Sequence, residues 1–188
     1  MKKVLVIIDM QNDFITGSLK NPDAEAIVSK ICKYLKQSNN SFDDVVLTKD
    51  THYSNYLETS EGKNLPVKHC LFETEGNAVN KDIIDTLYKT EYIDKTSVVA
   101  KQTFGFLNWA ELFEKIRIAQ DEEVTITLVG TCTDICVVSN ALILKNVFPD
   151  YTIEVMENLC AGTSPENHMA AIDVMKSCQV EINNSVIE

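Results

Sequence analysis

The stretch from Leu128 to Asn140 places two cysteines where a predicted strand turns into a helix. Cys136 falls in the first turn of that helix, where exposed N–H groups and the positive end of the helix dipole favour negative charge. We therefore expect a lowered thiol pKa and a nucleophilic thiolate. The amides of the same turn could hold the oxyanion formed when this thiolate attacks a carbonyl group. A lone cysteine is more often a small buried apolar residue, so the hypothesis needs a base and a cation nearby.

Three charged residues stand at the ends of other predicted strands. Asp9 ends the first strand, Asp50 follows the second and Lys101 ends the third. Open parallel sheets bind ligands outside the C-terminal ends of their strands, so neighbouring strands would bring these groups to Cys136. Taken singly, Asp9 is equally well explained as a turn or capping acid, and Lys101 is better explained as a solvated surface lysine. Their joint placement favours a catalytic site.

A possible metal site lies in the segment from Asp50 to about Asn80, which has little periodicity and holds two of the three histidines. Loops this long inside compact domains are uncommon and often functional. Asp50 and His52 form an Asp-x-His pair, and Glu61 and His69 follow. Such nitrogen and oxygen donors suit a borderline metal such as zinc. The alternative is a polar loop whose histidines are close only in sequence.

Two further features are weaker candidates for chemistry. His168 lies on the apolar stripe of a predicted helix, which favours a core histidine over a catalytic one. Cys132 and Cys136 form C-x-x-x-C, which lacks the C-x-x-C spacing of redox motifs. We expect Asp13 and Asp134 to order the backbone near the site.

The elements that must position these residues alternate between short apolar runs and amphipathic segments. This alternation predicts an α/β fold with a parallel sheet covered by helices on both faces. The predicted strands are Val4–Ile8, Val45–Thr48, Ser97–Ala100, Thr125–Val129, Thr152–Met156 and, more weakly, Val180–Ile182. Helices are predicted to begin at Asn21-Pro22 and at Ser164-Pro165, to run over 106–116 and to follow Cys136.

Composition limits the class of protein. A chain of 188 residues fits one domain, 1–188, and its net charge of −11 argues against nucleic acid or an anionic membrane as partner. The first apolar run ends at Asp9, too early for a signal peptide, and no run reaches transmembrane length. With no secretory signal, we interpret the six cysteines as reduced thiols of a cytoplasmic protein.

Three separated motifs resemble those of the isochorismatase-like cysteine hydrolases, in the family's order and over nearly the whole chain. They are Val6–Phe14 (VIIDMQNDF), Lys101–Phe106 (KQTFGF) and Val129–Val137 (VGTCTDICV). The resemblance implies a three-layer, Rossmann-like fold with a six-stranded, mostly parallel sheet, and a catalytic triad of Asp9, Lys101 and Cys136. It also implies a cis peptide before Cys132, and an oxyanion hole formed by the amides of Cys132 and Cys136.

Within this superfamily, the irregular segment is similar to that of nicotinamidases. The resemblance implies a divalent metal, zinc with iron or manganese as alternatives, held by Asp50, His52 and His69. The fourth ligand varies among nicotinamidases between His and Glu, and we expect Glu61 here, with Glu58 as second choice. The metal of nicotinamidases contacts the pyridine nitrogen of nicotinamide. Where many of them carry an aromatic residue shortly before the metal histidine, this chain has Leu65, so the expected cavity walls are Leu65 with Phe14, Phe104 and Phe106.

The function predicted from the sequence is therefore hydrolysis of nicotinamide to nicotinate and ammonia through a thioester on Cys136. The alternative is an isochorismatase-like hydrolase of another small amide or carbamoyl compound. A non-catalytic binding or thiol-redox protein on the same fold would require a broken triad, whereas Asp9, Lys101 and Cys136 are all present. The resemblance also implies a homo-oligomer.

Overall fold

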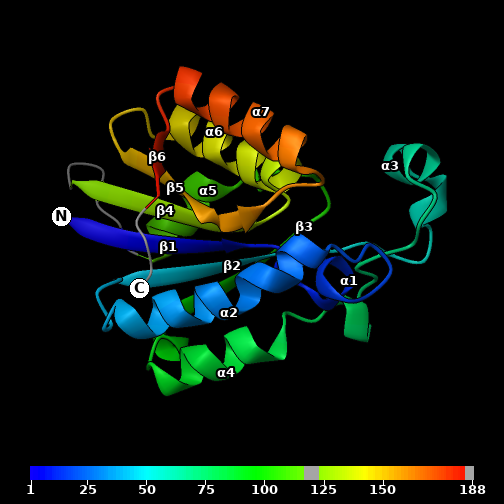
Figure 1. The fold of residues 1–188 in the computed structure, drawn as a ribbon, viewed down its shortest axis with the longest axis horizontal. Coiled ribbons are helices and arrows are strands. Elements are labelled where there is room, and N and C mark those ends of the chain that lie inside the picture. Colours follow the sequence, from blue (N-terminus) through cyan, green and yellow to red (C-terminus); the bar gives the residue numbers. More distant parts are fainter. Residues whose placement is uncertain (117–122, 185–188) are drawn as a thin grey trace.

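The computed structural model describes residues 1–116 and 123–184 and is built around one sheet of six strands. The strand order is β3-β2-β1-β4-β5-β6, and every neighbouring pair is parallel (Figure 1). The strands are β1 (Lys2–Ile8), β2 (Asp44–Asp50), β3 (Thr96–Lys101), β4 (Val124–Thr131), β5 (Thr152–Ala161) and β6 (Glu181–Asn183). The predicted α/β fold and six-stranded sheet are confirmed, and the sheet is parallel throughout.

Helices cover both faces of this sheet (Figure 1). On one face lie α2 (Pro22–Gln37) and α4 (Lys81–Lys89); on the other lie α5 (Trp109–Lys115), α6 (Val138–Val147) and α7 (Pro165–Ser177). Successive side chains of a strand point to opposite faces, so β1 serves both layers. Leu5 and Ile7 pack in the core beneath α2 and α4, while Val4, Val6 and Ile8 join the core beneath α5, α6 and α7.

The helix starts predicted from the sequence are largely confirmed. The Asn21 side chain accepts hydrogen bonds from the N–H groups of Asp23 and Ala24, and Pro22 occupies the first helical position of α2. Ser164 caps α7 in the same way. The helix predicted over 106–116 is shorter, because α5 begins only at Trp109.

Short helical turns fill the irregular parts of the chain. They are α1 (Asn12–Ile15), η1 (Tyr56–Glu58), α3 (Ser60–Asn64), η2 (Glu75–Asn77), η3 (Ile93–Lys95) and the π-helical turn η4 (Thr133–Val137). The segment with α3 projects from the rest of the molecule (Figure 1). Among the described residues, no helix has both the length and the apolar character needed to cross a membrane.

Candidate active site

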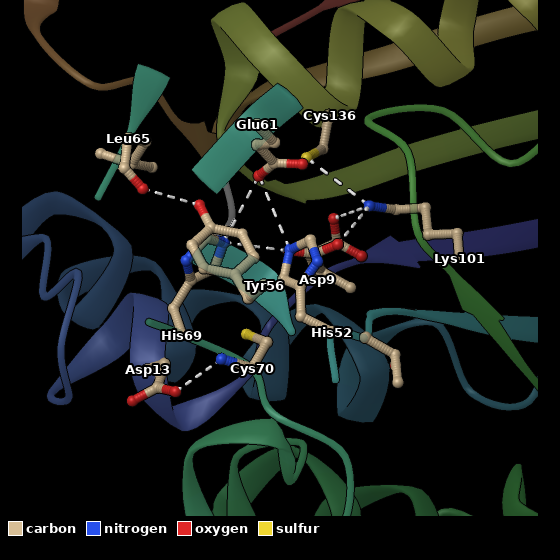
Figure 2. Close-up of polar contacts among 12 residues, drawn as sticks. Asp9, Asp13, His52, Tyr56, Glu61, Leu65, His69, Cys70, Lys101 and Cys136 are labelled. Carbon is tan, nitrogen blue, oxygen red and sulfur yellow. Dashed lines mark hydrogen bonds and ion pairs between the residues drawn. The ribbon is translucent and has the colours of Figure 1, made fainter. Parts of the chain in front are cut away.

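The predicted catalytic residues meet at the C-terminal ends of neighbouring strands. Asp9 directly follows β1, Lys101 ends β3, and Cys136 lies in η4 between β4 and α6. The Lys101 Nζ atom is 2.6 Å from Asp9 Oδ2 and 3.7 Å from Cys136 Sγ (Figure 2). Asp50, at the end of β2, is the register partner of Lys101. The convergence expected from the strand ends is therefore present, because the strand order makes β3, β2, β1 and β4 neighbours.

The backbone around Cys136 requires a close approach between β4 and β1. Gly130 has φ of 123°, and a Cβ atom there would lie 2.2 Å from the Ile8 carbonyl oxygen. Only glycine fits such a position. The Thr131–Cys132 peptide that follows is cis, as the family resemblance implied.

Asp9 and Lys101 form a buried ion pair. Asp9 is fully buried and Lys101 is 5 % exposed. Burial raises the pKa of the Asp9 carboxyl group, and the Lys101 ammonium opposes this rise. Burial likewise disfavours the charged form of Lys101, but the neighbouring Asp9 and Cys136 raise its pKa above the usual range. Each charge thus stabilises the other where burial would otherwise disfavour both.

The Cys136 thiol differs from the sequence prediction. Burial raises its pKa well above the usual value, and the Asp9 carboxylate raises it further by charge and by a hydrogen bond. The expected lowering of the thiol pKa at a helix start is therefore wrong. Cys136 is only 7 % exposed and lies beside a carboxylate, so burial raises the thiol pKa by more than the start of the helix lowers it. The raised pKa favours a neutral Cys136 thiol beside the Asp9 carboxylate.

Four predicted metal ligands face one another beside this triad. The Asp50 Oδ2 atom lies 2.9 Å from His52 Nε2 and 3.3 Å from His69 Nε2. The Glu61 Oε1 atom lies 3.6 Å and 3.7 Å from the same two nitrogens (Figure 2). All four donor atoms fall within 4.8 Å of one another. Glu58, the second choice as fourth ligand, is exposed and lies outside this cluster.

The chemistry of this donor set fits a divalent cation. The Nδ1 atom of His69 donates to the Val67 carbonyl oxygen at 2.8 Å, which leaves Nε2 as the atom that would ligate a cation. Burial raises the pKa of Glu61, and the Asp50 carboxylate raises it further. Two carboxylates that repel each other and two imidazoles make a set that a cation would satisfy.

A cavity of about 380 Å³ joins the triad to this cluster. Its wall includes Cys132 and Cys136 as well as the predicted metal ligands Asp50, Glu61 and His69. The predicted cavity residues Phe14, Leu65 and Phe104 all line it, together with Leu19, Lys20, Asn21, Pro22, Ile135 and Thr163. A small molecule in this cavity would touch both groups at once.

Phe106, which was also expected in the cavity wall, does not line it. Its backbone N–H donates to Asn140 Oδ1 at 2.9 Å, and its ring packs edge-on against Trp109 with centroids 5.2 Å apart. The chain turns after Gly105, so Phe106 packs against the core beneath α5, α6 and α7 instead. The prediction was wrong because the motif gave no direction for this side chain.

Several buried polar residues that support the site had no predicted role. Gln11 accepts the Asp50 N–H at 2.7 Å and donates to the Asp50 carbonyl at 2.8 Å. Asn77 donates to the same carbonyl at 2.8 Å. Asn140 donates to the Cys136 carbonyl at 2.8 Å. These amides hold the backbone of the predicted metal ligand Asp50 and of the predicted nucleophile Cys136. Gln11 stands in the VIIDMQNDF motif, whereas nothing in the sequence marks Asn77 or Asn140 for this role.

The two aspartates expected to order the backbone do so. Asp13 accepts the Cys70 N–H at 2.7 Å and so fixes the residue after His69 (Figure 2). Asp134 accepts the Thr163 N–H at 2.8 Å. His168 is half-buried, and its Nδ1 atom lies 2.8 Å from Thr133 Oγ1. This contact agrees with the structural role that was favoured for His168.

This fold and site match a known class of hydrolases. The model of the isochorismatase domain matches residues 3–185, and the chain belongs to this family. It is 29 % identical to the nicotinamidase/pyrazinamidase of Mycobacterium tuberculosis, over 96 % of this chain and 97 % of that protein. It is also 29 % identical to an uncharacterised isochorismatase family protein of Bacillus subtilis, over 92 % of this chain and 93 % of that protein.

Solved structures agree with this assignment. The pyrazinamidase/nicotinamidase of Streptococcus mutans superimposes with a TM-score of 0.82 at 26 % identity, covering 97 % of this chain and 100 % of that one. The pyrazinamidase of Pyrococcus horikoshii, solved in complex with zinc, shares the fold with a TM-score of 0.75 at 20 % identity, over 98 % of this chain and 100 % of that one. The family resemblance found in the sequence is confirmed.

Proposed function

We propose that this protein hydrolyses nicotinamide to nicotinate and ammonia, with Cys136 as nucleophile. As an isochorismatase-family enzyme with nicotinamidase/pyrazinamidase relatives, it is an amidase acting on small carboxamides. The observation that supports the finer proposal is the single cavity that joins Cys136 to the Asp50, His52, Glu61 and His69 cluster. A ring nitrogen and a carboxamide on one small molecule match these two ends.

The proposed chemistry uses the triad in two stages. Asp9 accepts the thiol proton of Cys136 while the sulfur attacks the carboxamide carbon, and Lys101 stabilises the resulting anions. The amides of Cys132 and Cys136 hold the oxyanion. Asp9 then gives its proton to the departing nitrogen, which leaves as ammonia, and a thioester remains. Water attacks the thioester carbon, the C–S bond breaks to release the acid, and the proton lost by the water passes through Asp9 back to the Cys136 sulfur. The raised pKa of the Cys136 thiol agrees with this sequence of steps, because the thiol keeps its proton until the sulfur attacks the carboxamide carbon.

Asp50, His52, Glu61 and His69 are the residues that would hold a divalent cation, zinc or else iron or manganese. When bound, such a cation supplies a Lewis acid that accepts the lone pair of the pyridine nitrogen. The chain's own residues complete the binding site: Phe14 and Phe104 offer aromatic walls to the ring, and Leu65 adds an apolar wall.

The proposed substrate is tested by measuring ammonia release from nicotinamide, pyrazinamide, benzamide and small carbamoyl compounds. Benzamide has the shape of nicotinamide but no ring nitrogen, so we expect its kcat/KM to be at least ~10-fold lower, since one buried polar interaction is lost. Equal rates for the two would contradict recognition through the ring nitrogen. Turnover of carbamoyl compounds alone would favour the alternative function.

Metal removal should also loosen the segment that carries Glu61. This segment, the Tyr56–Leu65 arm, is closed on itself by a 2.9 Å hydrogen bond from the Tyr56 hydroxyl to the Leu65 carbonyl. The arm meets the two histidines through the Tyr56 ring, with centroids 4.6 Å from His52 and 5.0 Å from His69, and through Glu61. A cation shared by Glu61 and the histidines would fasten the arm to the sheet.

We therefore expect a chelator to increase trypsin cleavage after Lys63, an exposed residue of the arm, relative to cleavage after Lys89 on α4. Added Zn²⁺ should restore protection. Glu61→Gln should raise cleavage after Lys63 even with metal present, whereas Glu58→Gln, on the same arm but outside the cluster, should not. Unchanged cleavage after chelation would show that the cluster does not fasten the arm through a metal.

The chain is proposed to form one domain, 1–188, to work in the cytoplasm and to form a homo-oligomer. All six cysteines carry free thiols, in agreement with a reducing compartment. Gel filtration with light scattering would give the subunit number.

A further inference from the structure

We propose that Thr48 is a positioning residue that holds the Asp9 carboxylate in its reactive orientation, an inference that rests on the proposed function. Thr48 lies on β2, the strand next to β1, and is 1 % exposed. Its hydroxyl donates to Asp9 Oδ1 at 2.6 Å. The same oxygen accepts the backbone N–H of Asp9 at 3.2 Å. One hydroxyl thus contacts both the backbone and the side chain of the base.

These two bonds fix the direction in which the hydroxyl proton points. A threonine hydroxyl has a single proton, and an oxygen that accepts the Asp9 N–H directs this proton elsewhere. The Asp9 carboxylate is the acceptor within reach. Asp9 also has φ of 47°, a left-handed conformation that is uncommon for a residue other than glycine and is held only where neighbours impose it. The two hydrogen bonds of Thr48 to Asp9, called the Thr48 clasp below, supply one such constraint at the end of β1.

The two carboxylate oxygens of Asp9 have different partners. Oδ1 accepts from Thr48, and Oδ2 lies 2.6 Å from Lys101 Nζ. With both oxygens held, the carboxylate plane cannot rotate away from the Cys136 thiol, which bonds to it. The charged or titratable groups that face Asp9 are Lys101 from β3, Cys136 from η4 and Asp50 from β2. Thr48 is the uncharged neighbour of Asp9, and it orients the Asp9 carboxylate without adding a charge to the site.

The test compares Thr48→Val, which keeps the shape of the side chain and removes both bonds, with Thr48→Ser, which keeps the hydroxyl. We expect Thr48→Val to lower kcat for nicotinamide by about 10- to 100-fold with little change in KM, as for displaced reacting groups. Alkylation of Cys136 by iodoacetamide, which needs no amide substrate, should slow in parallel. Thr48→Ser should restore most of both rates. Metal content should be equal in all variants.

Thr127→Val serves as the matched control, because Thr127 is also a buried strand threonine whose hydroxyl bonds a carboxylate, that of Glu154. It should leave both rates near wild type. If wild type does not hydrolyse nicotinamide, the alkylation rates still test the clasp separately from the function. Equal alkylation of Thr48→Val and wild type would overturn the proposal. If Thr48→Val fails to fold, Thr48→Ala removes the same hydroxyl and replaces it in the test. If neither variant folds while Thr127→Val does, the role of Thr48 is purely structural and the proposal is overturned.

Discussion

Replacing Cys136 with alanine is expected to reduce ammonia release from nicotinamide by on the order of 10⁴-fold or more, as is typical when a covalent nucleophile is removed. The sulfur is the only protein atom in the proposed scheme that bonds to the substrate carbon, and Lys101 and Asp9 both contact it. The change removes one buried atom, so the fold should persist. The rate is measured by coupled ammonia detection, and the fold by circular dichroism.

Cys160→Ala is the matched control for this result. Cys160 is also a buried thiol, 6 % exposed, but it lies on β5 and does not line the catalytic cavity. We expect its variant to keep most of the activity. Turnover retained by Cys136→Ala would contradict the assignment of the nucleophile, and equal losses in both variants would indicate general damage to the core.

Replacing Asp9 with asparagine is expected to produce the second large loss. Asparagine has almost the same shape but cannot take the thiol proton, so the rate should fall by on the order of 10²–10⁴-fold, the usual contribution of a general base. It also breaks the 2.6 Å ion pair and leaves the buried Lys101 ammonium with only the Asp50 carboxylate, 3.9 Å away. Breaking a buried ion pair costs about 3–5 kcal/mol of unfolding free energy. Single-turnover ammonia release and urea denaturation measure the two effects.

Asp44→Asn provides the comparison at the other end of the same sheet. Asp44 begins β2 and pairs with Lys2 at 3.1 Å in a partly exposed ion pair. Such pairs contribute little, about 0–1 kcal/mol, so both activity and stability should stay near wild type. If Asp9→Asn retained activity within a few-fold of wild type, Asp9 would not be the base.

The sequence was sufficient to predict the triad because a parallel sheet imposes a simple rule. The apolar runs that end at or just before Asp9, Asp50 and Lys101 could be recognised individually. In a parallel sheet the C-terminal ends of all strands lie at the same edge, so these residues were expected to meet there. The metal cluster was predictable for another reason: histidines are few in this chain, and two of them stand beside acids in a segment without periodicity. Residue type and position carried this information.

Orientation and solvation could not be predicted in the same way. Phe106 and Phe104 are two residues apart, yet Phe104 lines the cavity and Phe106 packs on Trp109, because the local backbone turn decides where each ring points. Thr48 and Gln11 act through hydrogen bonds across strands, which depend on the register of β1 and β2. The thiol pKa was predicted in the wrong direction, since burial depends on packing that the sequence does not reveal.

The central claim is that Cys136 forms a thioester with the substrate, and intact-mass spectrometry tests it most directly. The enzyme is mixed with excess nicotinamide, quenched in acid during turnover and weighed, with Cys136→Ala treated identically. The mechanism predicts a fraction of wild-type protein heavier by one nicotinoyl group in place of a hydrogen, mapped by peptide digestion to Cys136, and no such species in the variant. The same adduct on the Cys136→Ala protein, or its location on any other residue, would contradict the mechanism.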